Sequence, residues 1–237
     1  MDYSFDLPAL NERFEQASPE EILEWGARQF GDRVVVSSSF QTQSVALLHL
    51  IGQVCPQLPV IFVDTGYHFA ETLAYRDQLI DLLGINVISV SADLDKRQDF
   101  DADGITPLHR TNPDLCCALH KTAPMAKALI GRDAWISGIR RQQTGTRSAA
   151  HHIEQQADGL YKLNPLLGWT SKDLWTYINR HDLPTHPLFS LGYASIGCAP
   201  CTRAIQDGED ERAGRWAGTN KIECGLHTAD IRSVAAQ

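Results

Sequence analysis

The sequence lacks a long apolar run, and it has fewer positive than negative charges. No stretch of its 237 residues approaches the roughly 20 apolar residues of a membrane-spanning helix, so no span is expected. Residues 1–11 contain Asp2 and Asp6 and lack a basic stretch followed by an apolar one. This argues against a secretory signal and leads us to expect a cytoplasmic protein. With 21 Lys and Arg against 29 Asp and Glu, the net charge of −8 does not favour nucleic-acid binding.

The remaining composition is that of a soluble globular protein, 43% hydrophobic and 21% charged. The length fits one domain with an appendage and suffices to bury a core without disulfides or metal. No internal repeat or low-complexity tract is present. We therefore expect a main unit over residues 1–205 and a mobile C-terminal arm over 206–237, because residues 207–220 are rich in glycine and charge with little apolar periodicity.

Short apolar strands alternate with helices in the first part of the chain. Runs at 34–36, 59–63, 85–90 and 134–137 are typical of buried strands, and helices are expected at about 18–31, 45–51, 70–83 and 170–180. Such alternation predicts an α/β fold with a parallel sheet flanked by helices. Ligands of these sheets bind where strands end, which is where residues 37–40, 64–66 and 138–141 fall.

Four of the six cysteines form two close pairs, Cys116–Cys117 and the motif Cys198-Ala199-Pro200-Cys201. In a cytoplasmic protein such cysteines favour metal or redox chemistry over structural disulfides. Four thiolates fit tetrahedral zinc or an iron–sulfur cluster, and both alternatives stay open at this point. Because neighbouring side chains diverge, the adjacent pair fits separate iron atoms better than one small ion. Buried unliganded thiols are the third alternative, and they explain Cys55 best.

A fifth cysteine lies near the end of the chain, in Glu223-Cys224-Gly225-Leu226-His227. A thiol on a mobile arm could enter a pocket and leave it again, and a charged His227 could lower its pKa. The alternatives are an incidental thiol of the tail and a disulfide relay with Cys201.

A serine-rich loop and two arginine clusters are candidate anion-binding elements. Ser37-Ser38-Ser39-Phe40 joins a strand to a helix, so its amides and hydroxyls could hold a phosphate, although the loop lacks the glycines and lysine of a Walker A motif. The arginines are well suited to phosphate or sulfonate oxygens, and they are Arg140, Arg141, Arg147, Arg203, Arg212 and Arg215. An ordinary βα turn and a solvated, charge-balanced surface are the alternatives.

Taken together, these segments closely resemble the assimilatory adenylyl-sulfate reductases, within the wider adenylyl-sulfate and phosphoadenylyl-sulfate reductase family. The resemblance extends over residues 20–228. Its motifs are Ser37–Phe40, Val63–Gly66, Cys116-Cys117 with Lys121, Ser137–Arg147, Gly192–Thr202, Gly208–Trp216 and Glu223–His227.

The resemblance implies an adenine-nucleotide α-hydrolase-like fold of the ATP-pyrophosphatase superfamily and one [4Fe–4S] cluster per chain, held by Cys116, Cys117, Cys198 and Cys201. It assigns the nucleophile to Cys224, which would form a thiosulfonate during thioredoxin-dependent reduction of adenylyl sulfate to sulfite and AMP. A glutaredoxin-like donor would serve equally, and the sequence allows a homo-oligomer. The implied substrate-binding residues are Ser37, Ser38, Ser39, Phe40, Val63, Lys121, Gly138, Arg147, Arg212, Arg215 and His227.

The chain departs from that pattern at two places. Gln41-Thr42-Gln43-Ser44 follows the serine loop where cluster-bearing members usually have Gly and an acidic residue, and Gln43 is similar to enzymes that take the 3′-phosphorylated nucleotide. The tryptophan-rich stretch after Arg215 is reduced to Trp216. Phosphoadenylyl sulfate therefore stays open as a substrate, and a non-catalytic zinc-binding nucleotide sensor is the alternative from another class.

Overall fold

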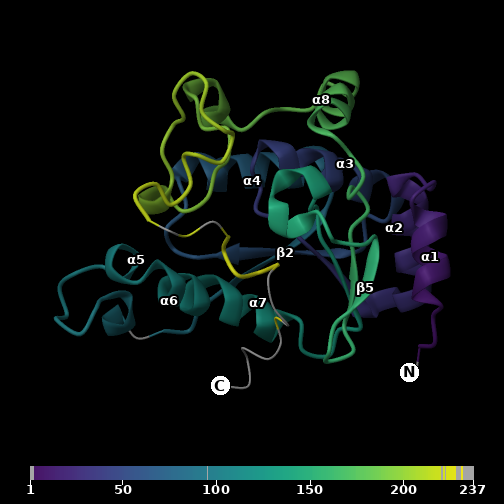
Figure 1. The fold of residues 1–237 in the computed structure, drawn as a ribbon, viewed down its shortest axis with the longest axis horizontal. Helices are drawn as coiled ribbons and strands as arrows, with labels where there is room; N and C mark the ends of the chain where they lie inside the picture. The colour runs from purple at the N-terminus through teal and green to yellow at the C-terminus, as the bar shows by residue number, and fades with distance from the viewer. Residues whose placement is uncertain (1–2, 95, 220, 222, 228–230, 232–237) are drawn as a thin grey trace.

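The computed structural model describes residues 3–94, 96–219, 221, 223–227 and 231. Its centre is a six-stranded sheet that runs through the middle of the molecule (Figure 1). The strand order is β3-β2-β1-β4-β6-β5. Neighbouring strands are parallel except β5 and β6, which are antiparallel. The strands are β1 (Val34–Ser37), β2 (Pro59–Asp64), β3 (Asn86–Ser91), β4 (Ala134–Ile136), β5 (Ile153–Gln155) and β6 (Tyr161–Leu163).

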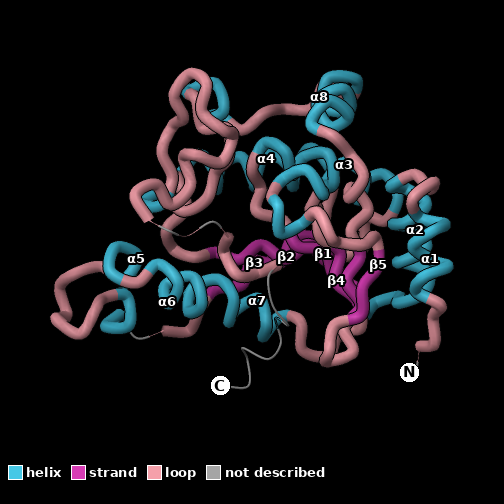
Figure 2. The backbone as a smooth tube through the Cα atoms, viewed as in Figure 1, coloured by secondary structure: helices cyan, strands magenta, loops and turns pink. Residues whose placement is uncertain are grey.

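Side chains of alternate residues leave the two faces of the sheet and enter two separate apolar clusters. Val34 and Val36 of β1 pack on one face, whereas Val35 packs on the other. Helices cover both faces (Figure 2). The helices are α1 (Leu7–Phe14), α2 (Pro19–Phe30), α3 (Val45–Val54), α4 (Ala70–Leu83), α5 (Leu108–Thr111), α6 (Pro113–Cys117), α7 (Ala123–Ala128) and α8 (Ser171–Arg180).

The sequence-based fold class is confirmed, and the four predicted strands and four predicted helices are present. Capping boxes explain why two helices begin where they do: Ser18 pairs with Glu21 in α2, and Thr170 with Asp173 in α8. The sequence-based prediction did not include β5 and β6. These strands have three residues each, too short for a period-two pattern to stand out.

The described part of residues 206–237 packs against the α/β body. Trp216 is buried, and Ile231 is fully buried in the same cluster as Val35 and Trp135. This cluster also contains residues of α7, so the C-terminal residues complete the cover of one sheet face. Whether this segment moves as an arm stays a prediction.

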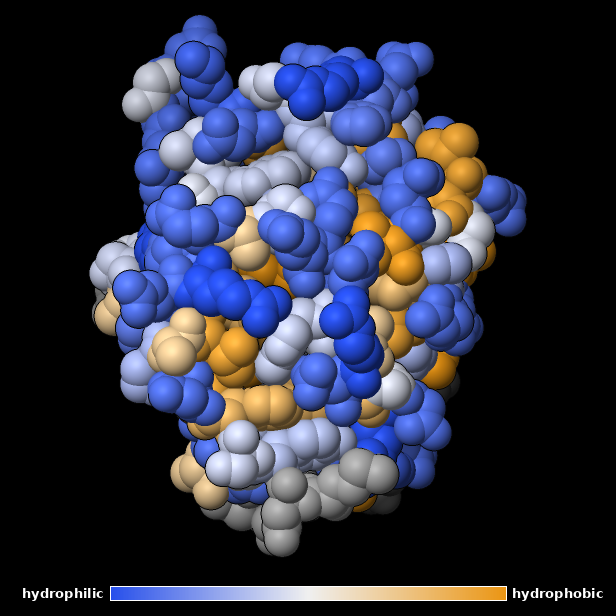
Figure 3. Space-filling view, turned by 90° about the vertical axis from the view of Figure 1, so that its right-hand side faces the viewer, coloured by the Kyte–Doolittle hydropathy of each residue, from blue (hydrophilic) through white to orange (hydrophobic). Residues whose placement is uncertain are grey.

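The described residues include no helix long and apolar enough to cross a bilayer. The face beside α1 and α2 is mostly hydrophilic, with its apolar side chains in separate patches (Figure 3).

Candidate active site

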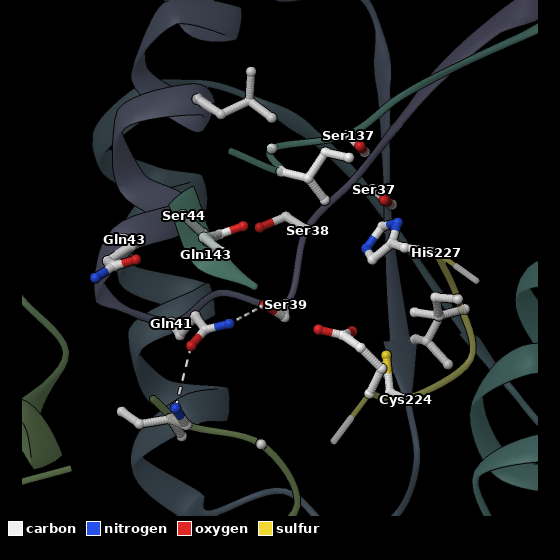
Figure 4. Close-up of a pocket in the computed structure, with 18 of the residues that line it drawn as sticks. Ser37, Ser38, Ser39, Gln41, Gln43, Ser44, Ser137, Gln143, Cys224 and His227 are labelled. Carbon is white, nitrogen blue, oxygen red and sulfur yellow. Dashed lines mark hydrogen bonds between the residues drawn. The ribbon is translucent and has the colours of Figure 1, made fainter. Parts of the chain in front are cut away.

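The main pocket opens where the strand order reverses. From β1 the chain proceeds through β2 to β3 on one side, and β4 lies on the other side of β1. Loops leaving adjacent parallel strands in opposite directions create a crevice at their carboxyl ends. All the predicted substrate-binding residues except Phe40 line this pocket, together with Cys224. Figure 4 shows Ser37 beside His227, with Ser38 and Ser39 on the other side of the pocket from Cys224.

The serine loop is held in place from two sides. Trp135 Nε1, from the neighbouring strand β4, donates a hydrogen bond of 2.8 Å to Ser37 Oγ. Gln41 Nε2 donates to Ser39 Oγ at 3.0 Å, and Gln41 Oε1 accepts from Ile196 N at 3.1 Å (Figure 4). The loop is thereby tied to the segment that leads into Cys198.

Phe40 does not line the pocket. Its side chain is fully buried and packs edge-on against Phe62, with ring centroids 5.5 Å apart. Its φ of 49° lies in the left-handed region, which is uncommon for a residue with a side chain. Its amide donates a hydrogen bond to Ser38 Oγ at 3.2 Å, so Phe40 stabilises the conformation of the serine loop from the core side.

Val63 and Gly138, two of the predicted substrate-binding residues, both line the pocket. The carbonyl of Val63 lies 3.0 Å from His68 Nε2, which donates to it if Nε2 carries the proton. A Cβ on Gly138 would lie 3.2 Å from the Leu47 side chain, so glycine keeps this backbone open to the pocket. Beside it, Ser137 Oγ donates to the buried Asn164 Oδ1 at 2.6 Å.

Five Lys and Arg side chains line the pocket: Lys121, Arg140, Arg147, Arg212 and Arg215. Lys121 lies in a π-helical turn, Ala118–Thr122, between α6 and α7. Burial lowers its pKa, but Cys224 and Cys198 raise it by more, so the ammonium is held in its charged form. Burial lowers the pKa of Arg215, yet a guanidinium stays charged in a protein. The pocket can therefore bind a multiply charged anion despite the net charge of the chain.

His227 is not the source of positive charge beside Cys224. Burial lowers its pKa well below the usual value, and the nearby cations Lys162, Arg147, Lys121 and Arg212 lower it further. The imidazole is therefore neutral and stacks on Trp135, with centroids 5.4 Å apart and an interplanar angle of 12°. The cations that interact electrostatically with Cys224 include Lys121 and Arg215.

Glu223 is a residue of the pocket that the sequence-based site prediction did not include. It is buried, and its carboxylate pairs with Arg147 at 3.0 Å and Arg212 at 3.3 Å. Gln143 is a second pocket residue that the prediction did not include. Its Oε1 accepts a hydrogen bond from the Arg140 amide and contacts Arg147 Nη1. The position of Glu223 next to Cys224 was the available signal, but its arginine partners depend on the fold.

The four paired cysteines line a second pocket that adjoins the first. Lys121, Arg215 and Trp216 line both pockets. Burial raises the pKa of Cys116 to about 12 and that of Cys201 to about 11, and the neighbouring thiolates raise both further. Thiols gathered in this way favour a bound cation, which would stabilise their thiolate forms.

Among the described residues, no group of three or more His, Cys, Asp or Glu side chains is arranged to hold a metal ion. Cys116, Cys117, Cys198 and Cys201 nevertheless surround one cavity, and four thiols of this kind are suitable ligands for zinc or for an iron–sulfur cluster. Thr65 Oγ1 lies 3.3 Å from Cys198 Sγ and can orient that thiol.

All six cysteines are free thiols in this structure. A disulfide between Cys224 and Cys201 is therefore not formed here. Cys55 is buried, and burial raises the pKa of its thiol to about 12, so it is an unreactive core residue.

Comparison with known proteins agrees with this geometry. The profile of the phosphoadenosine phosphosulfate reductase domain matches residues 33–204. An "Adenosine 5'-phosphosulfate reductase" of Streptomyces coelicolor is 44% identical, covering 94% of this chain and 95% of that protein. A "Phosphoadenosine 5'-phosphosulfate reductase" of Gloeobacter violaceus is 41% identical, covering 93% of each.

A solved structure supports the same relationship. The phosphoadenylyl-sulfate reductase of Candida auris, in a phosphate complex, superposes with a TM-score of 0.71 at 25% identity, covering 84% of this chain and 98% of that one. FMN adenylyltransferase of Candida glabrata, with a TM-score of 0.56 and 16% identity, covering 86% of this chain and 69% of that one, shares the fold alone. The chain belongs to the phosphoadenosine phosphosulfate reductase family.

Proposed function

We propose that this protein reduces adenylyl sulfate to sulfite and AMP, with Cys224 as the nucleophile. One observation carries the proposal: Cys224, the serine loop and five Lys and Arg side chains from different parts of the chain line a single pocket. The names of relatives such as the Streptomyces coelicolor reductase support the choice of substrate. The reaction belongs to sulfate assimilation, and we infer a cytoplasmic location.

In the first step the Cys224 thiolate attacks the sulfonate sulfur of the nucleotide. A sulfur–sulfur bond forms, the bond from that sulfur to the bridging phosphate oxygen breaks, and AMP leaves with the bonding electrons. Lys121, Arg147, Arg212 and Arg215 neutralise the charge that grows on the leaving phosphate, and Ser37–Ser39 hold its oxygens. The product is a thiosulfonate on Cys224.

In the second step a dithiol donor of the thioredoxin or glutaredoxin type supplies two electrons. One of its thiolates attacks the Cys224 sulfur and releases sulfite, and its second thiol resolves the mixed disulfide. Cys224 returns to the thiol form, and the donor leaves as a disulfide. The two-step scheme requires the Cys224 thiol to meet the nucleotide and the donor in turn, which is the reason for predicting an arm that moves.

We infer that Cys116, Cys117, Cys198 and Cys201 hold one [4Fe–4S] cluster. When bound, the iron core would compensate the charge of the four thiolates. Lys121 and Arg215 line both pockets and so are placed to orient the anionic end of the substrate against Cys224.

Phosphoadenylyl sulfate is the second candidate substrate. Gln43 lines the pocket, accepts from Arg140 Nη2 at 2.6 Å and donates to Glu211 at 3.1 Å. The Gloeobacter violaceus relative carries the name of a reductase for that nucleotide. Sulfite release from each nucleotide, measured under nitrogen with thioredoxin supplied, distinguishes the two substrates.

The Cys224→Ser variant tests the nucleophile. We expect it to fold, keep its iron and bind nucleotide, but to form no covalent sulfite adduct and to lose activity, because a hydroxyl is a poor nucleophile at neutral pH. Mass spectrometry after incubation with adenylyl sulfate measures the adduct. Turnover at the rate of the unsubstituted protein would contradict the assignment.

The Cys198→Ser variant tests the ligand set. We expect iron and activity to be lost together, with Cys55→Ser as the matched control that retains both. Iron analysis of anaerobically purified protein gives the result. A colourless, iron-free unsubstituted protein that binds zinc and releases no sulfite would instead support the nucleotide-sensor alternative.

A further inference from the structure

Glu223, the residue next to the nucleophile Cys224, forms ion pairs with two arginines of the pocket. Arg147 Nη2 donates to both of its carboxylate oxygens, at 3.1 and 3.0 Å, and Arg212 Nη2 donates to one of them at 3.3 Å. The side chains of Arg147 and Glu223 are only 10% and 6% exposed. Arg147 belongs to the turn Gly145–Arg147 that follows β4, so this ion pair joins the α/β body to the C-terminal segment.

The donors of Arg147 are arranged as an anion site that Glu223 already fills. Nη1 contacts Gln143 and Nη2 serves Glu223, while the buried Nε has no hydrogen-bond partner among the described residues. A guanidinium binds an oxyanion through two parallel donors, either Nε with Nη2 or Nη1 with Nη2. Both arrangements need Nη2. Because Nη2 donates to both Glu223 oxygens here, a substrate oxyanion held bidentately by Arg147 would compete with the carboxylate for that nitrogen.

We propose that Glu223 is a positioning residue whose carboxylate occupies the anion site of the pocket before substrate binds. In this position it holds the neighbouring Cys224 in the pocket. The phosphosulfate group of the substrate then displaces the carboxylate. The inference rests on the proposed function, since it assumes an adenylyl-sulfate substrate. The carboxylate neutralises a pocket that also contains Lys121, Arg212 and Arg215. Nucleotide binding and the Glu223 contact then compete for the same two arginines.

The first experiment compares nucleotide affinity in a Cys224→Ser background, where adenylyl sulfate binds without turnover. Adding Glu223→Gln removes the competing charge but keeps an amide of the same size. We expect the dissociation constant for adenylyl sulfate, measured by anaerobic titration calorimetry, to fall roughly tenfold, as for loss of one charge-assisted contact. The matched control is Glu209→Gln, because Glu209 pairs with Arg203 on the surface at 2.7 Å and lies outside the pocket. Its affinity is expected to stay unchanged.

The second experiment keeps Cys224 and measures how firmly it is docked. We expect iodoacetamide to alkylate Cys224 several-fold faster in Glu223→Gln than in the unsubstituted protein or Glu209→Gln, without nucleotide, as followed by peptide mass spectrometry. Glu223→Asp, whose carboxylate is one methylene shorter, should give intermediate values in both experiments and serves if the glutamine variant does not fold.

An affinity that is unchanged or weaker in Glu223→Gln would overturn the inference, because a merely structural glutamate does not compete with substrate. If the Cys224→Ser protein itself binds no adenylyl sulfate, the proposed function fails, and this inference fails with it.

Discussion

At the scale of single residues, burial sets the protonation state of several histidines. His186 is fully buried, and burial lowers its pKa to about 4, with Glu71 opposing the shift. Its Nδ1 accepts from Leu188 N at 3.2 Å, and its Nε2 lies 2.9 Å from Thr72 Oγ1. The neutral ring thus fixes the turn Pro187–Leu191 against α4.

This pKa predicts a loss of stability in acid. The unfolded state binds a proton near pH 6.5, whereas the folded state resists it down to about pH 4. The free energy of unfolding should therefore be highest above pH 6.5 and fall as the pH decreases toward 4. His186→Asn keeps an acceptor for Leu188 but cannot titrate. We expect its slope against pH near 5 to be smaller by up to about 1.4 kcal/mol per pH unit.

Anaerobic urea unfolding at several pH values, followed by tryptophan fluorescence, measures the slope. His151→Asn is the control, since His151 is exposed and should leave the slope unchanged. An equal slope in His186→Asn and the unsubstituted protein would show that His186 already titrates normally.

At the scale of elements, one short turn connects the two pockets. Gly197 precedes Cys198, and the guanidinium of Arg215 packs where a Cβ on Gly197 would lie. Arg215 also donates to Ile196 O at 3.2 Å, and its guanidinium carbon lies 4.4 Å from the centre of the Trp216 ring. The turn that presents Cys198 and Cys201 therefore depends on the same side chain that lines the nucleotide pocket.

Gly197→Ala is expected to displace Arg215 and so to affect both pockets. We expect lower iron content and a KM for adenylyl sulfate at least several-fold higher, with an overpacking cost of about 1–3 kcal/mol. Iron analysis and steady-state kinetics measure the two effects. Gly168→Ala, where an added Cβ meets nothing within 4 Å, is the matched control. Normal iron and KM in Gly197→Ala would mean that Arg215 can be moved without consequence.

At the scale of the whole molecule, the C-terminal residues are part of the packing of the sheet. Ile231 is fully buried with Val35, Ile61 and Trp135, whose side chains leave β1, β2 and β4 on one face. Trp216 and Ile231, on either side of Cys224 in the sequence, are both buried, so Cys224 is tethered to the body of the protein at two points.

Ile231→Ala tests this packing. Loss of a fully buried isoleucine should lower the free energy of unfolding by about 2–4 kcal/mol. Ile130→Ala is the control, because Ile130 is 64% exposed and should change stability little. Urea unfolding gives both values. A negligible effect of Ile231→Ala would support an arm that is independent of the core.

Local patterns were sufficient for much of the fold and for many residues of the candidate site. The capping signals of α2 and α8 and the β-branched run of β1 are local, so they were predictable without knowing the fold. The segment around α6 and the π-helical turn was not predicted, since a single turn has no periodicity to detect.

The sequence by itself determined the α/β alternation and, through its motifs, the separation of four paired cysteines from Cys224. Only the tertiary structure decided that Arg147 and Glu223 meet beside Cys224 and that His227 lies neutral against Trp135. The physical reason is that charge pairing and burial depend on which distant segments the sheet brings together, whereas strand and helix signals are carried by near neighbours in the chain.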